Sequence, residues 1–214
     1  MVSIVPSAIM SRRRYGAGKL WVAPLGTITN NFTPTVTGGV FVQGTTATQV
    51  PGATAWLPVG ITTEGTKFTS SFDTDNDESA EYYYPHAVIV TGQTCTLEVE
   101  LKTVDLTNLR VALNAATSQV NGTPTASSFA RLTPPLPGSE VRMQWMWEST
   151  AADMLIVLYK GLNTGDVELT AQKGAAGMNI PLTISGELPD AAVATTPFDI
   201  LTCGTSYAES VSGE

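Results

Sequence analysis

The sequence predicts a mainly β fold, a β-sandwich or open barrel with one α-helix packed against it. Two observations carry this prediction. Several short segments of the 214-residue chain alternate apolar and polar residues, which is the pattern of a strand with one buried face. One segment alone has the three- and four-residue apolar spacing of a helix. About nine or ten strands and one helix are therefore expected, and strands in that number form a sandwich or barrel.

The clearest expected strand spans Gln93–Lys102. Its apolar residues are Cys95, Leu97, Val99 and Leu101, and its polar residues are Thr94, Thr96, Glu98, Glu100 and Lys102. Successive side chains of a strand point to opposite faces, so one face is expected in the core and the other in water. Cys95 lies on the apolar face and is expected to be a buried free thiol.

The expected helix directly follows this strand. Its apolar positions are Leu106, Leu109, Leu113 and Ala116. Asp105 stands before them, where its carboxylate can accept hydrogen bonds from the free backbone amides of the first turn. We expect the other strands to be arranged around this strand and helix.

The remaining expected strands are shorter. They are residues 19–25, 67–72, 81–84, 87–91, 141–148, 154–159, 178–185 and 198–203. Residues 154–159 are apolar at every position, which indicates a strand buried on both faces, or one with one face in the core and the other against a partner. Gly92 is expected to turn the chain between the strand at 87–91 and the strand that begins at Gln93.

Segments without a regular pattern outline the organisation of the chain. Residues 19–203 are expected to form one β domain, between an N-terminal arm at 1–18 and a polar C-terminal tail at 204–214. Two regions rich in Thr, Gly and Pro interrupt that domain. The region 26–54 is expected to hold loops and short edge strands, and the region 117–139 to be a long loop or insertion that serves contacts.

An acidic run, Asp73 to Glu78, lies between the expected strands 67–72 and 81–84. We interpret it as the solvated, mobile tip of a long hairpin. A calcium-binding loop is the alternative, because carboxylates recur at alternate positions. The calcium template fails, since Glu78 stands where the turn glycine belongs and Tyr84 where the bidentate acid belongs.

Residues that most enzymes need are scarce. His86 is the one histidine, and it follows Pro85 at an expected turn. Glu98 and Glu100 share one strand face, whereas the two acids of a glycosidase usually come from different elements. We therefore expect no catalytic residues, no metal site and no cofactor. The net charge of −8 argues against a protein that grips nucleic acid by its phosphates.

Three stretches in order resemble one family. The stretch Leu57-Pro-Val-Gly-Ile-Thr-Thr-Glu-Gly65 precedes the expected hairpin, and the strand Thr94–Leu101 leads into the helical segment Val104–Asn114. This arrangement resembles the major tail tube proteins of long-tailed bacteriophages with non-contractile tails. In that family a VG-T--G stretch opens the tube hairpin, and a strand is followed by a helix of the type t-x-x-n-L-x-x-A-L. The similarity is best over residues 57–114.

The resemblance implies a structural virion protein. Copies would form hexameric rings that stack into a tube, with strands of each copy joined in one barrel around a lumen. Its partners would be other copies, the tape-measure protein in the lumen, and the tail terminator and tail-tip proteins. DNA would pass through without specific binding, and the protein would be made in the host cytoplasm. No apolar run approaches the roughly 20 residues that span a bilayer, so we expect no membrane insertion.

The resemblance and the charge pattern together suggest two sets of site residues. Residues expected to face the lumen are Thr94, Thr96, Glu98, Glu100, Thr183 and Ser185. Residues expected at contacts between copies or rings are Arg12, Arg13, Arg14, Asp73, Asp75, Asp77 and Glu78. An acidic, Thr-rich wall suits a channel for DNA, because it repels phosphates. The alternatives are an ordinary solvated outer face and a solvated basic tail.

Two other functions compete with the tail tube. The first is another virion component, a tail terminator or a capsid decoration protein. The second is a carbohydrate-binding β-sandwich, for which Tyr82–Tyr84 and the pair Trp145 and Trp147 are the candidate aromatic residues.

Overall fold

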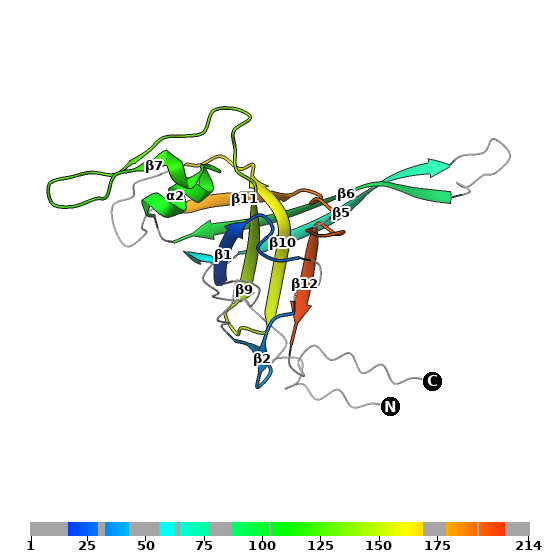
Figure 1. The fold of residues 1–214 in the computed structure, drawn as a ribbon. Coiled ribbons are helices and arrows are strands. Elements are labelled where there is room, and N and C mark those ends of the chain that lie inside the picture. Colours follow the sequence, from blue (N-terminus) through cyan, green and yellow to red (C-terminus); the bar gives the residue numbers. More distant parts are fainter. Residues whose placement is uncertain are drawn as a thin grey trace.

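The computed structural model describes residues 17–29, 33–42, 56–62, 65–77, 87–102, 104–168, 179–191 and 193–203. In these ranges the fold is mainly β with one α-helix, as predicted (Figure 1). The strands are β1 Gly18–Pro24, β2 Val36–Thr37, β3 Val40–Phe41, β4 Leu57–Ile61, β5 Lys67–Asp77, β6 Ala87–Leu101, β7 Val120–Asn121, β8 Arg131–Leu132, β9 Met143–Ser149, β10 Met154–Asn163, β11 Ile180–Gly186 and β12 Phe198–Thr202. The helix is α2 Leu106–Ala112, and a 3₁₀ turn, η1, spans Thr117–Gln119. None of the described helices is long and apolar enough to cross a membrane.

The large sheet curls toward a barrel. Its strands follow the order β4-β1-β9-β10-β11-β6-β5, and all neighbours are antiparallel. One edge of β10 pairs with β9, and the other pairs first with β12 and then with β11. β4 returns to β6 through a bridge between Thr62 and Leu101, beside which the Lys102 amide donates to the Ile61 carbonyl at 3.3 Å. The strands from β4 to β6 therefore enclose a common interior.

That interior holds the larger hydrophobic core. Trp145 on β9 and Leu158 on β10 are fully buried in it, among inward residues of β1, β6 and β11. The indole nitrogen of Trp145 donates to the carbonyl of Gly161 at 3.2 Å, so its polar atom is satisfied. Helix α2 packs beside β11 and β4, where Val111 and Ala112 join the same core. The helix therefore covers one side of the barrel (Figure 1).

A second core lies on the outer face of β9 and β10. Leu155, Val157 and Tyr159 point into it, while Ile156 and Leu158 between them point into the barrel. The hydroxyl of Tyr159 donates to Asp199 on β12, and burial together with this carboxylate raises the pKa of Tyr159. The predicted strand with two buried faces is confirmed, because β10 separates the two cores.

The alternation of the strand before the helix is also confirmed. Cys95, Leu97, Val99 and Leu101 are buried, and the polar residues between them face away from the core. Cys95 is a free thiol whose pKa is raised by burial, which keeps it protonated and apolar. On the neighbouring β11, Ile180, Leu182 and Ile184 repeat this pattern. Their apolar rows meet inside the barrel.

The prediction of a turn at Gly92 is wrong. β6 continues without interruption from Ala87 to Leu101, and Gly92 lies opposite Asp73 inside the ladder with β5. The register shifts between Asp73 and Thr74, so a bulge absorbs one extra residue of β6. Backbone hydrogen bonds to a long partner strand outweigh the local preference of glycine for a turn.

The prediction that the acidic run forms a hairpin tip is wrong in its described part. β5 extends through Asp77, so Asp73, Asp75 and Asp77 are strand residues. Their partner segment is Ala87–Gly92, in place of the expected strand 81–84. Residues 78–86, which include Glu78, Tyr82–Tyr84 and His86, lie outside the described ranges.

The helix begins as predicted but buries a different stripe. The carboxylate of Asp105 accepts the amide of Asn108 at 2.7 Å, which caps the first turn. The fully buried positions are Asn108, Val111, Ala112 and Ala115, whereas the predicted Leu106, Leu109, Leu113 and Ala116 are half-buried. Smaller residues allow the helix to sit close to the strands, and the leucines lie at the margins of this contact.

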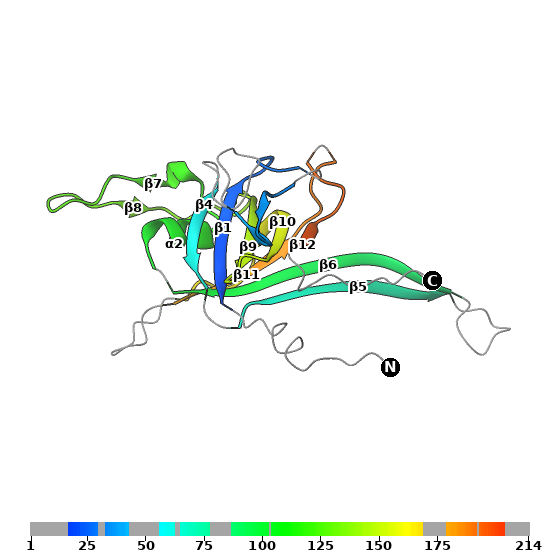
Figure 2. The same cartoon turned by 90° about the horizontal axis from the view of Figure 1, so that it is seen from below.

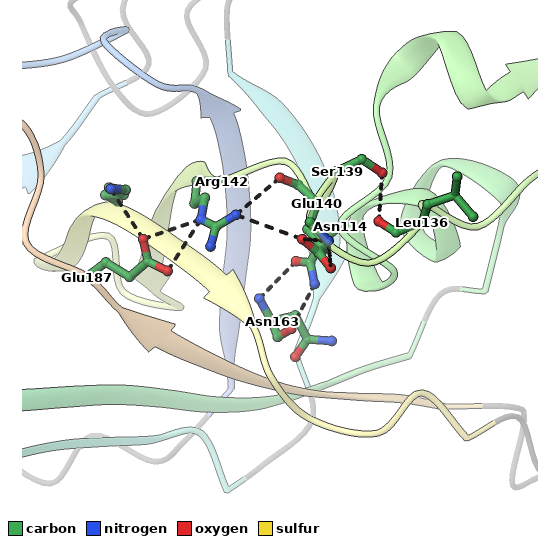
Figure 3. A network of polar contacts seen from close by, with 9 residues as sticks. Asn114, Leu136, Ser139, Glu140, Arg142, Asn163 and Glu187 are labelled. Atoms are coloured by element: carbon green, nitrogen blue, oxygen red, sulfur yellow. Dashed lines mark hydrogen bonds and ion pairs between the residues drawn. The ribbon is translucent and has the colours of Figure 1, made fainter.

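A pair of buried asparagines joins the end of α2 to the end of β10 (Figure 3). The side-chain amide of Asn114 donates to the backbone carbonyl of Asn163 at 2.8 Å. In return, the backbone amide of Asn163 donates to Asn114 Oδ1 at 2.9 Å. Asn163 also donates to the Ala112 carbonyl at 2.7 Å and accepts the Thr183 amide at 2.9 Å. Asn114 has φ of 53°, a left-handed conformation that asparagine tolerates and that ends the helix.

Replacing Asn163 with alanine is expected to lower the free energy of unfolding by about 3 kcal/mol, because two buried backbone groups lose partners at a cost of about 1–3 kcal/mol each. Urea denaturation followed by tryptophan fluorescence measures this change. Asn121→Ala is the matched control, since Asn121 is an exposed asparagine of β7. Equal unfolding midpoints for the two variants would contradict a stabilising role for the Asn163 hydrogen bonds between α2 and β10.

The region 117–139 contains a short hairpin that projects from the barrel (Figure 2). β7 pairs with β8, and the amide of Thr125 donates to the carbonyl of Ser128 at 3.0 Å near the tip. Gly122 has φ of +86°, and a Cβ there would lie 2.5 Å from the carbonyl oxygen of Phe129. Glycine is therefore required where the two sides of this hairpin approach. The hairpin extends away from the barrel on the side opposite to the free ends of β5 and β6.

Candidate assembly surface

The most unusual feature of the fold is an arm formed by the outer parts of β5 and β6. β11 pairs with β6 only at residues 95–101, so residues 87–94 of β6 pair with β5 alone. Both figures of the whole chain show this two-stranded ribbon leaving the barrel and continuing well beyond it (Figures 1 and 2). We call residues 70–77 and 87–94 the arm. Two-stranded ribbons are at best marginally stable alone in water, so a long arm needs support.

One face of β11, β6 and β5 is mostly polar and lies opposite the barrel core; Pro181 and Ile89 are its exposed apolar members. Register pairs Glu98 with Lys67 on β5 and with Thr183 on β11, and it pairs Thr96 with Thr69 and Ser185. The six residues predicted to face the lumen therefore share this face, which we call the polar face. They are Thr94, Thr96, Glu98, Glu100, Thr183 and Ser185.

Hydrogen bonds between neighbouring strands order the polar face. Lys67 Nζ lies 3.0 Å from Glu98 Oε1, and the hydroxyls of Ser71 and Thr94 are 2.7 Å apart. The side chain of Asn179 donates to Glu100 at 2.9 Å. These contacts are solvent-exposed, so each contributes little to stability. They hold the carboxylates at fixed positions along the sheet.

The acidic residues of β5 extend the polar face along the arm. Asp73 lies opposite Gly92 in the ladder. The side chain of Asp73 covers this glycine, because Asp73 Oδ2 is 3.1 Å from the position that a Cβ atom on Gly92 would occupy. Alternation puts Asp75 on the same face as Asp73 and Lys67. Four exposed or half-exposed carboxylates, Asp73, Asp75, Glu98 and Glu100, thus share this face with the single cation Lys67 among the described residues of β5, β6 and β11.

The sequence prediction had assigned these aspartates to a different role. It separated them from the lumen residues and paired them with Arg12–Arg14 as contacts between copies. Arg12, Arg13 and Arg14, Glu78 and the side chain of Asp77 lie outside the described part of the chain. The signal that was missed is the alternation of Asp73, Asp75 and Asp77 with Thr74 and Asn76, which is the period of a strand.

The opposite face of the arm is exposed and carries large apolar residues between the polar Ser70, Thr74 and Gln93. Near the barrel, Phe68 is covered by Phe198, with ring centroids 4.9 Å apart, and it packs against the core. Farther out, Phe72, Val90 and Val88 are on the same face and are 60%, 58% and 61% exposed. Apolar residues on the face that forms the barrel core therefore recur along the arm, where no described residue of this chain covers them.

The structure also places several residues that were considered for sugar binding and for catalysis. Trp145 is 0% exposed and Trp147 is 8% exposed, so these two candidates for sugar stacking belong to the core. Glu98 and Glu100 lie on one strand face, with Glu98 paired to Lys67. In the described ranges, no group of three or more His, Cys, Asp or Glu side chains is arranged to hold a metal ion.

The candidate assembly surface is therefore the arm, with Asp73 and Asp75 on one face and the exposed Phe72, Val88 and Val90 on the other, and with free backbone groups along its outer edges in the described ranges. Such edges pair with strands of other chains, and such apolar rows pack against them. A comparison of this chain with protein-family models and with curated proteins finds no match.

Proposed function

We propose that this chain is a structural subunit of a bacteriophage tail tube. Copies assemble into hexameric rings, and the rings stack into a tube that surrounds a tape-measure protein and later conducts the genome. The tail terminator and tail-tip proteins bind its ends. This proposal combines the sequence resemblance over residues 57–114 with the surface described above.

The arm is the observation that carries the proposal. No described residue covers Phe72, Val88 and Val90 on the arm, and leaving such large apolar side chains in water is unfavourable. A neighbouring copy removes the problem, because its sheet can pair with the arm edge and its apolar residues can cover Phe72, Val88 and Val90. The same contact repeated between copies produces rings or filaments.

The polar face supports the choice of a tube over other assemblies. When arms and sheets of successive copies join side by side, their polar faces form one continuous wall. Asp73, Asp75, Glu98 and Glu100 make that wall acidic. A bore of this charge repels DNA phosphates at every position, so a genome slides through it without a trap.

Replacing both Val88 and Val90 with serine is expected to abolish assembly, because the contact loses most of its apolar area on the arm. Purified wild-type protein is expected to show rings or tubes by negative-stain electron microscopy and a large species by sedimentation velocity. The variant is expected to sediment as a monomer. Its unfolding midpoint is expected to stay unchanged, because both side chains are exposed within one copy.

Val36→Ser is the matched control, since Val36 is an exposed valine of β2 away from the arm. Tubes of normal length from the arm variant would contradict the assigned role of the arm. If the wild-type protein stops at a single ring, the proposed function changes from tail tube subunit to tail terminator, since only a tube protein polymerises into long filaments.

A further inference from the structure

The edge of β6 along the arm is free and unprotected. β11 pairs with β6 only at residues 95–101, so residues 87–94 have no neighbour on that side among the described strands. Exposed sheet edges in natural proteins usually carry charged residues or proline, which prevent pairing with other chains. Residues 87–94 contain neither, and Val88, Ile89 and Val90 all favour strands. This edge is therefore suited to accept a further strand.

The side chains around this edge define what the added strand must carry. Val88 and Val90 are exposed on one face, and Ile89 is exposed on the other. The face of Ile89 also holds Asp73 and Asp75 of the neighbouring β5. The sequence of the arm contains three aspartates and no lysine or arginine. A matching strand therefore has an apolar residue on one face and a cation on the other.

The hairpin of β7 and β8 carries a strand of this kind. Arg131 is the only charged residue in the sequence from 117 to 139. Its guanidinium carbon lies 5.9 Å from the centre of the Phe129 ring, so these two side chains share one face, and alternation puts Leu132 on the other. Phe129 is 73% exposed. Among the described strands β8 pairs only with β7, so its second edge is free.

The other described strands with a free edge match the arm less well. β4 contains Pro58, which lacks a backbone N–H for pairing, and it has no cation. β5 and β12 carry aspartates, which the acidic face of the arm repels. β2, β3 and β7 have two residues each, and none of these is charged. β8 is therefore the described edge strand whose charge complements the arm.

The hairpin and the arm of one copy cannot meet. Figures 1 and 2 both place the β7–β8 hairpin at one end of the molecule and the free ends of β5 and β6 at the opposite end, with the barrel between them. A contact between them therefore joins two copies. Each copy then offers its hairpin to one neighbour and its arm to the other, which is the head-to-tail arrangement that builds rings or filaments.

We propose that residues 129–132 of one copy pair, as an added strand, with residues 87–94 of its neighbour. Charge decides which faces match. Arg131 takes the acidic face of the arm beside Ile89, which leaves Leu132 on the face of the exposed valines. This contact rests on the proposed function, and it names the segment of the neighbouring copy that covers the arm.

Sedimentation velocity of the full chain over a range of concentrations tests this contact. Arg131→Glu on the hairpin and Ile89→Lys on the arm are each expected to weaken association by about tenfold or more, because each brings like charges together in the contact. Association of the wild-type protein is expected to weaken as salt increases, and Arg131→Gln is expected to reduce this salt dependence. Unfolding midpoints verify that each variant is folded, since both residues are exposed within one copy.

Mixing the two variants tests whether the hairpin and the arm bind each other. Arg131→Glu keeps an intact arm, and Ile89→Lys keeps an intact hairpin. An equal mixture is therefore expected to form dimers through one matching junction, and no larger species, whereas each variant alone stays monomeric. A mixture that sediments like the separate variants would overturn the contact.

Leu136→Ala is the matched control, because Leu136 is 77% exposed and follows the hairpin in the same region of the chain. Assembly of Arg131→Glu equal to that of this control would also overturn the contact, since another strand would then pair with the edge of β6. If Val88→Ser with Val90→Ser still blocks assembly in that case, the proposed function stands and only this contact fails. A monomeric wild-type protein overturns both.

Discussion

Trp145→Ala is expected to lower the free energy of unfolding by about 3–5 kcal/mol, which is a large share of the roughly 5–15 kcal/mol that stabilises a typical domain. Trp145 is fully buried at the centre of the barrel, where it lies against Gly161 and donates to its carbonyl. The substitution leaves a cavity that the surrounding strands cannot fill, because they are held by ladders on both sides. Urea denaturation measured by circular dichroism reports the change.

Phe129→Ala serves as the control for this substitution. Phe129 is also a large aromatic residue, but it is mostly exposed on the β7–β8 hairpin, so its removal is expected to change stability by less than about 0.5 kcal/mol. Similar losses for the two variants would mean that Trp145 is not the centre of the core.

In the proposed tube, replacing both Asp73 and Glu100 with lysine is expected to cause retention of DNA. Both residues belong to the polar face, and the change spares the Lys67–Glu98 pair. Lysines on the wall of a bore bind phosphates and release counterions, so retention is expected to rise about tenfold or more at low salt and to fall as salt increases. Co-sedimentation of tubes with a short fluorescent DNA duplex at two salt concentrations measures this effect.

Asp166→Lys with Glu168→Lys is the control for that experiment, because it makes the same charge change at exposed residues outside the sheet. Equal DNA retention by the two double variants would show that the position of the charges is unimportant. A density map of the tube with Glu98 and Glu100 on its outer wall would overturn the lumen assignment directly.

Local patterns in the sequence predicted the strands well. The alternation of Cys95, Leu97 and Val99 and the uniformly apolar residues 154–159 each identified the buried faces that the structure has. Asp105 was recognisable as the helix cap. These predictions succeed because the period of two in a strand and the free amides at a helix start are properties of the local backbone.

Predictions failed where a distant segment decides the outcome. Gly92 and the acidic run both resemble turns in isolation, but the ladder between β5 and β6 supplies backbone partners that keep both extended. The helix stripe was assigned to leucines, whereas the close approach of α2 to the strands favours Val111, Ala112 and Ala115. The link between Asn114 and Asn163 spans 49 residues of sequence and has no local signature.

The sequence by itself determined which strands exist, which of their faces are apolar, and that the chain carries an excess of acid. Only the tertiary structure decided that Asp73 and Asp75 share a face with Glu98 and Glu100, and that Phe72, Val88 and Val90 lie together on an arm where no described residue covers them. The physical reason is register. Alternation along one strand is set by covalent geometry, but which rows of side chains meet is set by hydrogen bonds between segments far apart in sequence.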